Sequence, residues 1–254
     1  MVLAIDIGNT NIVIGCFEDK KILFVERVST NRGATDLEYA SVIRTAIHIH
    51  GYNSSTLTGA IISSVVPGIT GIVRRAIEKY AKIKVLVVEP GLKTGLSIKV
   101  DNPAQVGSDL VVDAVAGINH YPTPLIIVDM GTATTVSVID RTKSYIGGMI
   151  LPGVAISADA LTSRTSQLPR IAFEAPRNAI GRNTVDCMKN GIMYSSACAL
   201  DGIIERIEEE LGESCTVIAT GGLASIVTPL CRRDIILDDD LLLKGLMTIY
   251  NKNI

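Results

Sequence analysis

One short pattern occurs twice in this chain of 254 residues and constrains its fold more than any other feature. A hydrophobic strand ends in Asp, Gly follows two positions later, and a Thr-containing turn leads into a second hydrophobic strand. The two copies read DIGNTN at residues 6–11 and DMGTATT at residues 129–135. One spacing aligns three identical pairs: Asp6 with Asp129, Gly8 with Gly131, and Val13 with Val136. Such self-similarity indicates an internal duplication.

The order of predicted elements restarts with the second copy. Hydrophobic periodicity predicts a first set of strands at 2–8, 11–17, 22–28, 59–66 and 84–88, with helices at 36–50 and 69–81. The second set comprises strands at 124–129, 134–140, 144–150 and 215–220, with helices at 153–162 and 184–211, from Leu223, and at 239–250. Thr35 or Asp36 would cap the helix at 36–50, and Gly51 would end it. The first strands of each set are joined by turns short enough for antiparallel hairpins. We therefore expect an α/β protein with two lobes, residues 1–103 and 104–254.

Composition excludes several classes of protein. Hydrophobic residues make up 47% of the chain, in short Val- and Ile-rich runs typical of strands buried on both faces. The net charge of −2 offers no basic surface for nucleic acid, and 4% aromatic residues offer few stacking surfaces. No apolar run approaches the roughly 18 residues of a membrane span. We expect no nucleic-acid partner and no association with a membrane.

Cysteine and histidine usage points to the cytoplasm and away from structural zinc. The five cysteines are odd in number and contain no CxxC pair, and no basic segment precedes a hydrophobic leader. Reduced thiols in a cytoplasmic protein are the expected state. The three histidines have no metal-ligand spacing with the cysteines.

The repeated hairpins have the chemistry of a phosphate site. An acid at the end of a buried strand requires a cation or hydrogen-bond donors near it, and glycine lets the backbone approach a ligand closely. Turn N–H groups, hydroxyls and amides donate to phosphate oxygens without bulk. Either hairpin alone is explained by an ordinary turn with Asp at its shoulder. The two together favour a polyphosphate, with a carboxylate near each hairpin for a cation.

Further glycine-rich segments are weaker signals. IATGGLA at 218–224 would place a helix N-terminus after a buried strand, which suits a nucleotide. GGMILPG at 147–153 fits a hinge or close packing as readily as binding. Neither GxxxxGK[ST] nor GxGxxG occurs, which argues against a P-loop and against a dinucleotide-binding motif.

Between the two patterns lies DNPAQVGSDLVVDAVAGI, at residues 101–118. Asn102 and Pro103 would start a helix whose hydrophobic residues recur every fourth position. Asp109 and Asp113 are four residues apart and share another side of it. An acid on this helix is a natural general base, although a solvated helix face explains the pair equally well. Spacing alone does not decide between the two acids.

These segments resemble type III pantothenate kinases, within the superfamily of acetate and sugar kinases, heat-shock ATPases and actin. The matching segments follow the family's order across almost the whole chain: DIGNTN (6–11), NPAQVGSD (102–109), DMGTATT (129–135), GGMILPG (147–153), IGRNT (180–184) and TGG (220–222). The resemblance implies a duplicated ribonuclease-H-like (actin-like ATPase) fold, with two lobes around a nucleotide cleft. It also implies a homodimer that phosphorylates pantothenate with ATP, the first step of coenzyme A synthesis.

The resemblance further implies roles for individual residues. The first phosphate loop would comprise Asp6, Ile7, Gly8, Asn9, Thr10, Asn11, Ile12 and Val13, and Asp6 would help to hold magnesium. Thr132 would contact ATP phosphates, and Asp129 would coordinate a monovalent cation, potassium or ammonium. Asp109 would accept the proton of the pantothenate hydroxyl. The pantothenate site would be lined by Gly107, Ser108, Asp109, Leu110 and Thr184.

One position departs from the family pattern Gly-x-Asp-Arg, because Leu110 stands where the family has Arg. Leucine cannot replace a guanidinium that pairs with an anion. Candidate replacements lie in the loop-rich stretch further on: Arg164, Arg170, Arg177 and Arg182. Two alternatives stay open, a kinase of another small hydroxylated substrate and a non-catalytic nucleotide-binding regulator. The three acids Asp6, Asp109 and Asp129 argue against the regulator.

Overall fold

A computed structural model describes residues 1–19 and 21–254, which form two compact units. The first unit comprises residues 1–96, 102–116 and 241–254, and the second comprises residues 97–101 and 117–240. Neither unit is one continuous segment, because helices from later in the chain complete the core of the first. The continuous lobes expected at 1–103 and 104–254 stay a prediction. The hairpin turn expected at 18–21 contains Lys20, which lies outside the described residues.

The first unit is a five-stranded sheet in the order β3-β2-β1-β4-β5. Its strands are β1 (Val2–Ile7), β2 (Asn11–Glu18), β3 (Lys21–Ser29), β4 (Gly59–Ser64) and β5 (Val85–Val87). β1, β2 and β3 pair antiparallel as expected, while β4 is parallel to both β1 and β5. The helices are α1 (Asp36–Ile49), α2 (Pro67–Ala81), α7 (Leu241–Asn251) and the greater part of α3 (Ser108–His120). A single-turn helix, η1 (Ser54–Thr56), precedes β4, and another, η2 (Pro103–Gln105), precedes α3.

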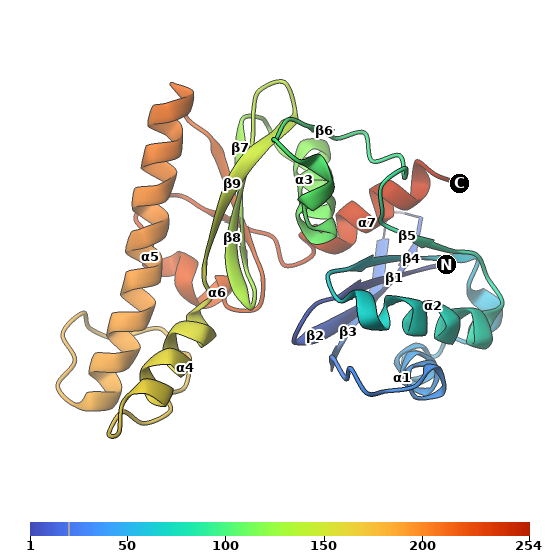
Figure 1. The fold of residues 1–254 in the computed structure, drawn as a ribbon, viewed down its shortest axis with the longest axis horizontal. Coiled ribbons are helices and arrows are strands. Elements are labelled where there is room, and N and C mark those ends of the chain that lie inside the picture. Colours follow the sequence, from blue (N-terminus) through green and yellow to red (C-terminus); the bar gives the residue numbers. More distant parts are fainter. Residues whose placement is uncertain (20) are drawn as a thin grey trace. The chain divides into compact units, whose positions relative to one another are not determined.

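Helices cover both faces of this sheet (Figure 1), which explains the continuous hydrophobic runs of its strands. Leu3 and Ile5 of β1 pack in one core with residues of α1 and α2. Ala4, between them, packs in a second core with Val112 of α3 and Leu246 of α7. The alternation of β1 side chains therefore requires a helix layer on each face.

Local signals define α1. Thr35 caps the helix, its hydroxyl accepting from the N–H of Glu38 while the Glu38 carboxylate accepts from the N–H of Thr35. Thr35 rather than Asp36 is thus the cap. After the helix, Gly51 has a φ of +79°, a conformation that glycine adopts without strain.

The second unit is a six-stranded sheet in the order β11-β10-β7-β8-β9-β6. Its strands are β6 (Ser97–Ile98), β7 (Leu125–Met130), β8 (Ala133–Ile139), β9 (Ser144–Pro152), β10 (Thr216–Thr220) and β11 (Ile236–Leu237). Its helices are α4 (Val154–Arg164), α5 (Thr184–Leu211), α6 (Ala224–Val227) and the single turn η3 (Thr228–Leu230). β7, β8 and β9 pair antiparallel and β10 is parallel to β7, which repeats the pairing of β1, β2, β3 and β4. The duplication expected from the sequence is therefore visible in the sheet topology.

Two predicted helices differ from the structure. The helix expected to start at Asn102 and Pro103 starts at Ser108, because the proline begins a separate single turn and Val106 is extended (φ −70°, ψ 124°). The helix expected from Leu223 is the short α6. The apolar stripe of α5 packs within the core of the second unit, through residues such as Met193, Leu200 and Ile204. Among the described residues, no helix combines the length and the apolar character that crossing a membrane requires.

Candidate active site

The turn between β1 and β2, residues 8–10, is closed by its own main chain. The N–H of Gly8 donates to the carbonyl of Asn11 at 3.0 Å. Asn9 and Thr10 at the tip are exposed to solvent. The first copy of the repeated pattern thus forms the tight hairpin that the sequence predicts, with its polar tip accessible to a ligand.

The strand residues that flank this turn differ in their burial. Asp6 is half-buried at the end of β1, between Val13 of β2 and Ser63 of β4 in the sheet register. Ile7 and Ile12 are at most 1% exposed and belong to the core, so their side chains do not line a ligand site. Of the apolar residues expected in the first phosphate loop, these two contribute only their backbone.

A loop that follows β3 is bonded to the same turn. The N–H of Thr30 donates to the carbonyl of Thr10 at 2.9 Å, and the Thr30 hydroxyl donates to the carbonyl of Gly8 at 2.7 Å. The guanidinium of Arg32 donates to Oδ1 of Asn9 at 2.8 Å. Residues 30–32 carry no recognisable motif, so no sequence signal identifies them as neighbours of the turn.

The segment between β4 and α2 joins the hairpin to the helix of Asp109. The N–H of Val65 donates to the carbonyl of Ile7 at 3.1 Å. The hydroxyl of Ser108 accepts from the N–H of Ser64 at 3.1 Å and donates to its carbonyl at 2.9 Å. Asp109 follows Ser108 in the first turn of α3. The first hairpin and the candidate base are therefore bonded to consecutive residues of one segment.

A pocket of about 280 Å³ adjoins this segment. It is lined by Asn9, Arg32, Val65, Val66, Pro67, Gly68 and Ile69. Two features give the pocket a positive character: the guanidinium of Arg32 and the start of α2 at Pro67, which is the positive end of the helix dipole. This is an environment that suits a phosphate group.

Burial separates the two candidate acids. Asp113 is 1% exposed, whereas Asp109 is half-buried. Burial raises the pKa of the Asp109 carboxyl, and the hydrogen bond from the N–H of Leu110, at 2.8 Å, acts in the opposite direction. A Cβ on Gly107 would collide with the Asp109 carboxylate, so a side chain at this position would displace that carboxylate. Asp109 is therefore the more exposed of the two candidate acids.

The second unit brings three of the predicted motifs together. Asp129, half-buried near the end of β7, is the register partner of Thr135 in β8 and Thr220 in β10. Gly221 follows with a φ of +95°, and a Cβ there would lie 2.5 Å from Oδ1 of Asp129 and 2.7 Å from the backbone of Met130.

The turn of the second hairpin, which begins at Gly131, is packed equally closely. A Cβ on Gly153, the last residue of the GGMILPG segment, would collide with the carbonyl of Thr132. The side chain of Thr132 is exposed. Gly153 of GGMILPG and Gly221 of IATGGLA thus let their own segments pack closely against the second hairpin.

The remaining predicted residues lie elsewhere in their units. Leu110 is half-buried in the first unit. Thr184 is exposed as the first residue of α5, which Asn183 caps by accepting from the N–H of Asp186 at 2.9 Å.

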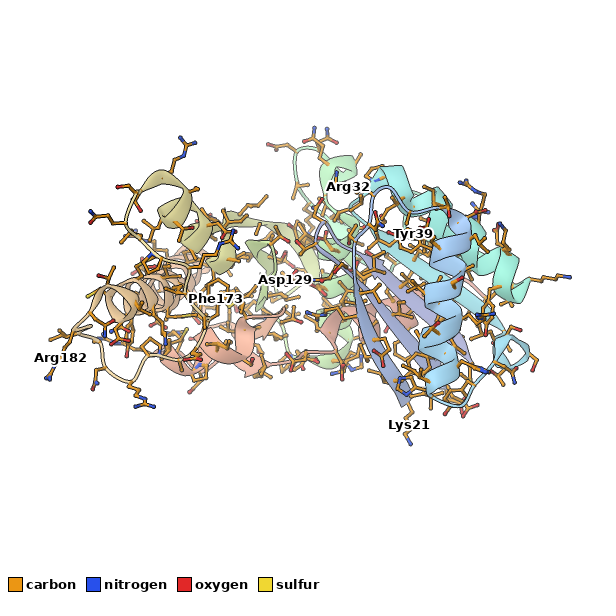
Figure 2. All side chains as sticks on the ribbon, turned by 90° about the horizontal axis from the view of Figure 1, so that it is seen from below. Lys21, Arg32, Tyr39, Asp129, Phe173 and Arg182 are labelled. Atoms are coloured by element: carbon orange, nitrogen blue, oxygen red, sulfur yellow. The ribbon has the colours of Figure 1, made fainter. Side chains whose placement is uncertain are left out.

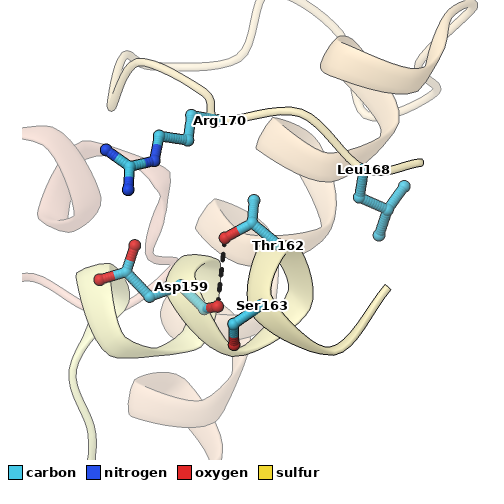
Figure 3. Close-up of a pocket in the computed structure, with 5 residues that line it drawn as sticks. All are labelled: Asp159, Thr162, Ser163, Leu168 and Arg170. Atoms are coloured by element: carbon cyan, nitrogen blue, oxygen red, sulfur yellow. Dashed lines mark hydrogen bonds between the residues drawn. The ribbon is translucent and has the colours of Figure 1, made fainter. Parts of the chain in front are cut away.

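Among the arginines considered as replacements for the missing guanidinium, Arg170 lines a pocket. This pocket, of about 430 Å³, lies in the second unit and is lined by Asp159, Thr162, Ser163, Leu168 and Arg170 (Figure 3). Asp159, Thr162 and Ser163 belong to α4, and Leu168 and Arg170 to the segment that follows it (Figure 3).

A model of the type III pantothenate kinase family matches residues 2–206. A type III pantothenate kinase from Bacillus cytotoxicus is 47% identical over 253 residues, which cover 100% of this chain and 97% of that protein. The chain belongs to the type III pantothenate kinase family. The family to which the motifs pointed is thus confirmed by a match over the full length.

Solved structures place this family member in its fold class. A Campylobacter jejuni protein described as a Baf family transcriptional activator superposes with a TM-score of 0.62 at 17% identity, covering 99% of this chain and 98% of that chain. Component A of (R)-2-hydroxyglutaryl-CoA dehydratase from Acidaminococcus fermentans superposes with a TM-score of 0.56 at 14% identity, covering 98% and 96%. At these identities the similarity concerns the fold alone. The type III pantothenate kinase chain has the duplicated, actin-like ATPase fold that the sequence predicted.

Proposed function

We propose that this type III pantothenate kinase transfers the γ-phosphate of ATP to the primary hydroxyl of pantothenate, with Asp109 as the general base. The product is 4′-phosphopantothenate, in the first step of coenzyme A synthesis. The observation that carries the assignment of the base is the attachment of both Ile7 and Ser108 to the segment at Ser64 and Val65. It places the accessible acid and the first phosphate hairpin in one part of the first unit.

The proposed reaction makes modest covalent demands. The hydroxyl oxygen of pantothenate forms a bond to the γ-phosphorus, the bond from that phosphorus to the bridging oxygen breaks, and ADP leaves with the electron pair. The Asp109 carboxylate accepts the hydroxyl proton. Positioning and charge neutralisation account for most of the acceleration in phosphoryl transfer. A correctly placed base adds roughly 10²–10⁴-fold.

The carboxylates suit the proposed cations. Magnesium in such enzymes is held by one or two carboxylates together with substrate phosphates and water. Asp6, half-buried beside the first hairpin, is a donor of that kind, and magnesium bound there would neutralise phosphate charge. In the second unit we propose Asp129 as a ligand of potassium or ammonium and Thr132 as a phosphate contact. The exposed side chain of Thr132 supports the second assignment.

Pantothenate is proposed to contact residues 107–110 and Thr184. The exposure of Thr184 and the half-buried state of Leu110 are compatible with such contacts. The hydroxyl of Ser108 is different, because its hydrogen bonds to Ser64 already engage it within the protein. A contact of Ser108 with the substrate would therefore use its backbone.

The test is release of ADP from ATP that depends on pantothenate, measured with and without potassium or ammonium. We expect turnover that requires pantothenate and rises with the monovalent cation. Asp109→Asn is expected to keep nucleotide affinity and to lose most turnover. Near-normal turnover of that variant would remove Asp109 from the mechanism.

Leu110 supports a second candidate function, a regulator that binds nucleotide without catalysis. A family arginine is absent from the position next to the proposed base. ATP binding without ADP production, in the presence of pantothenate and potassium, would favour the regulator. If the protein phosphorylates sugars from a test panel but not pantothenate, the proposed substrate is wrong.

We also propose that the kinase acts in the cytoplasm as a homodimer. On the second unit Ile150 is 77% exposed and Ile180 is 82% exposed, and burial of such apolar side chains between two copies would favour self-association. Light scattering after size exclusion measures the oligomeric state. A monomer at micromolar concentration would argue against the dimer.

A further inference from the structure

Residues 30–32 donate hydrogen bonds to oxygen atoms of the turn between β1 and β2. Thr30 donates to the carbonyls of Gly8 and Thr10, and Arg32 donates to the side-chain oxygen of Asn9. Three consecutive residues of the turn each have an oxygen engaged in this way. Oxygens that faced a phosphate would repel it, so their engagement by this loop favours an anion at the turn.

The loop at residues 30–32 is itself hydrogen-bonded to α1. The hydroxyl of Tyr39 donates to the carbonyl of Asn31 at 2.7 Å and accepts from the N–H of the same residue at 3.1 Å. Tyr39 is 4% exposed. Figure 2 shows Arg32 in the loop before α1 and Tyr39 on that helix. The main chain of Asn31, immediately before Arg32, is therefore hydrogen-bonded to α1.

The bond to Arg32 determines which way the Asn9 carboxamide points. A guanidinium has only donors, so the atom it contacts at 2.8 Å must be the amide oxygen of Asn9. The two N–H donors of that amide are then directed away from Arg32. Both residues line the pocket of about 280 Å³ beside the start of α2. An asparagine without this partner could turn its oxygen towards a phosphate.

We propose that Arg32 is a positioning residue for the nucleotide: it fixes the Asn9 carboxamide so that the amide N–H groups are presented to a phosphate oxygen. This role rests on the proposed function, in which the first hairpin holds the phosphates of ATP. It adds a residue from outside the matched motifs to the phosphate site.

The test measures the affinity for magnesium-ADP by calorimetry, together with kcat and the KM values for ATP and pantothenate. Arg32→Ala is expected to weaken ADP binding and to raise the KM for ATP by roughly 10- to 100-fold, the range for hydrogen bonds to a charged group. The KM for pantothenate is expected to change little. Arg32→Lys, which keeps a charged donor, is expected to recover much of the affinity. Arg44→Ala, on the exposed side of α1, is the matched control and should behave as the unmodified protein.

A double-mutant cycle decides whether Arg32 acts through Asn9. In an Asn9→Ala background, the further change Arg32→Ala is expected to cost little, because the amide to be positioned is gone. An equal loss in both backgrounds, or unchanged ADP affinity in Arg32→Ala, would overturn the proposal. So would a loss that merely follows a lower melting temperature. Failure of the unmodified protein to phosphorylate pantothenate would instead reject the proposed function, and ADP affinity would still test Arg32.

Discussion

The hydroxyl of Ser108 contacts both main-chain polar groups of Ser64, accepting from the N–H at 3.1 Å and donating to the carbonyl at 2.9 Å. The hydroxyl of Ser63, which is fully buried, lies 3.2 Å from the same oxygen. Because the single Ser108 proton is used on the carbonyl, Ser63 is the donor in that third contact. One side chain thus fastens the first turn of α3, and with it Asp109, to the end of β4.

Removal of this attachment is expected to reduce turnover. Ser108→Ala leaves the buried Ser63 hydroxyl without its acceptor and frees the start of α3, and a displacement of the base by about 1 Å can cost 10²-fold in rate. We expect kcat to fall with little change in nucleotide affinity, and Ser108→Thr to retain most of the rate. Ser41→Ala is the control, because the Ser41 hydroxyl donates to the carbonyl of Leu37 within α1 and is exposed. Unchanged kcat in Ser108→Ala would show that α3 holds Asp109 by packing alone.

Titration of Asp109 is expected to limit activity on the acid side. Burial raises the pKa of this carboxyl, and a base must be deprotonated to act. Activity is therefore expected to fall at a higher pH than an ordinary aspartate would produce. The kcat of the unmodified protein, measured across mildly acidic to neutral pH, tests this. An acid limb in the ordinary aspartate range, or none, would contradict the assignment.

The same pKa shift has a consequence for stability. A carboxyl whose pKa is raised in the folded state binds more protons there than in the unfolded chain, so its contribution to stability is lost as pH rises through the folded pKa. At neutral pH the buried charge is a cost. Asp109→Asn is therefore expected to match or exceed the unmodified protein in melting temperature at pH 7, with the difference disappearing at low pH. A clear loss of stability at neutral pH would show that the carboxylate has a structural role.

Restoring the family's arginine tests the departure at Leu110. The position is half-buried next to Asp109, and a guanidinium there can pair with an anionic group of the substrate. Leu110→Arg is expected to lower the KM for pantothenate. Leu110→Gln, polar but uncharged, is the control and should not do so. Equal effects of the two substitutions would mean that charge at this position is unimportant.

Gly221 is expected to tolerate no side chain. Its φ of +95° is unfavourable for alanine, by about 1–3 kcal/mol, and a Cβ would press on Asp129 and on the backbone of Met130. Gly221→Ala should lower the free energy of unfolding by at least that much, measured by urea denaturation. Gly202→Ala, in α5 where nothing beyond the local helix backbone lies within 4 Å of the added carbon, should be neutral or stabilising. Similar effects at both positions would refute the close packing around Asp129.

Local patterns were sufficient to locate most elements. The alternating runs and short turns identified β1, β2 and β3 and their counterparts β7, β8 and β9, because hairpin geometry depends on adjacent residues. The start of α3 was wrong by several residues, since a proline fits a separate single turn as well as a helix start. The difference between the buried Asp113 and the half-buried Asp109 could not be predicted from a spacing of four residues.

By itself, the sequence determined the duplication, the order of strands and helices, the two acid-and-glycine hairpins and the family to which the chain belongs. These properties depend on neighbouring residues, or on motifs that follow the family's order along the chain. Only the tertiary structure decided which of the two acids is partly exposed and which distant residues are bonded to the first hairpin. Asn9 and Arg32 are 23 residues apart, and Ser64 and Ser108 are 44 apart. Their contacts exist because packing of the sheet against its helices brings distant segments together, and no local pattern encodes that packing.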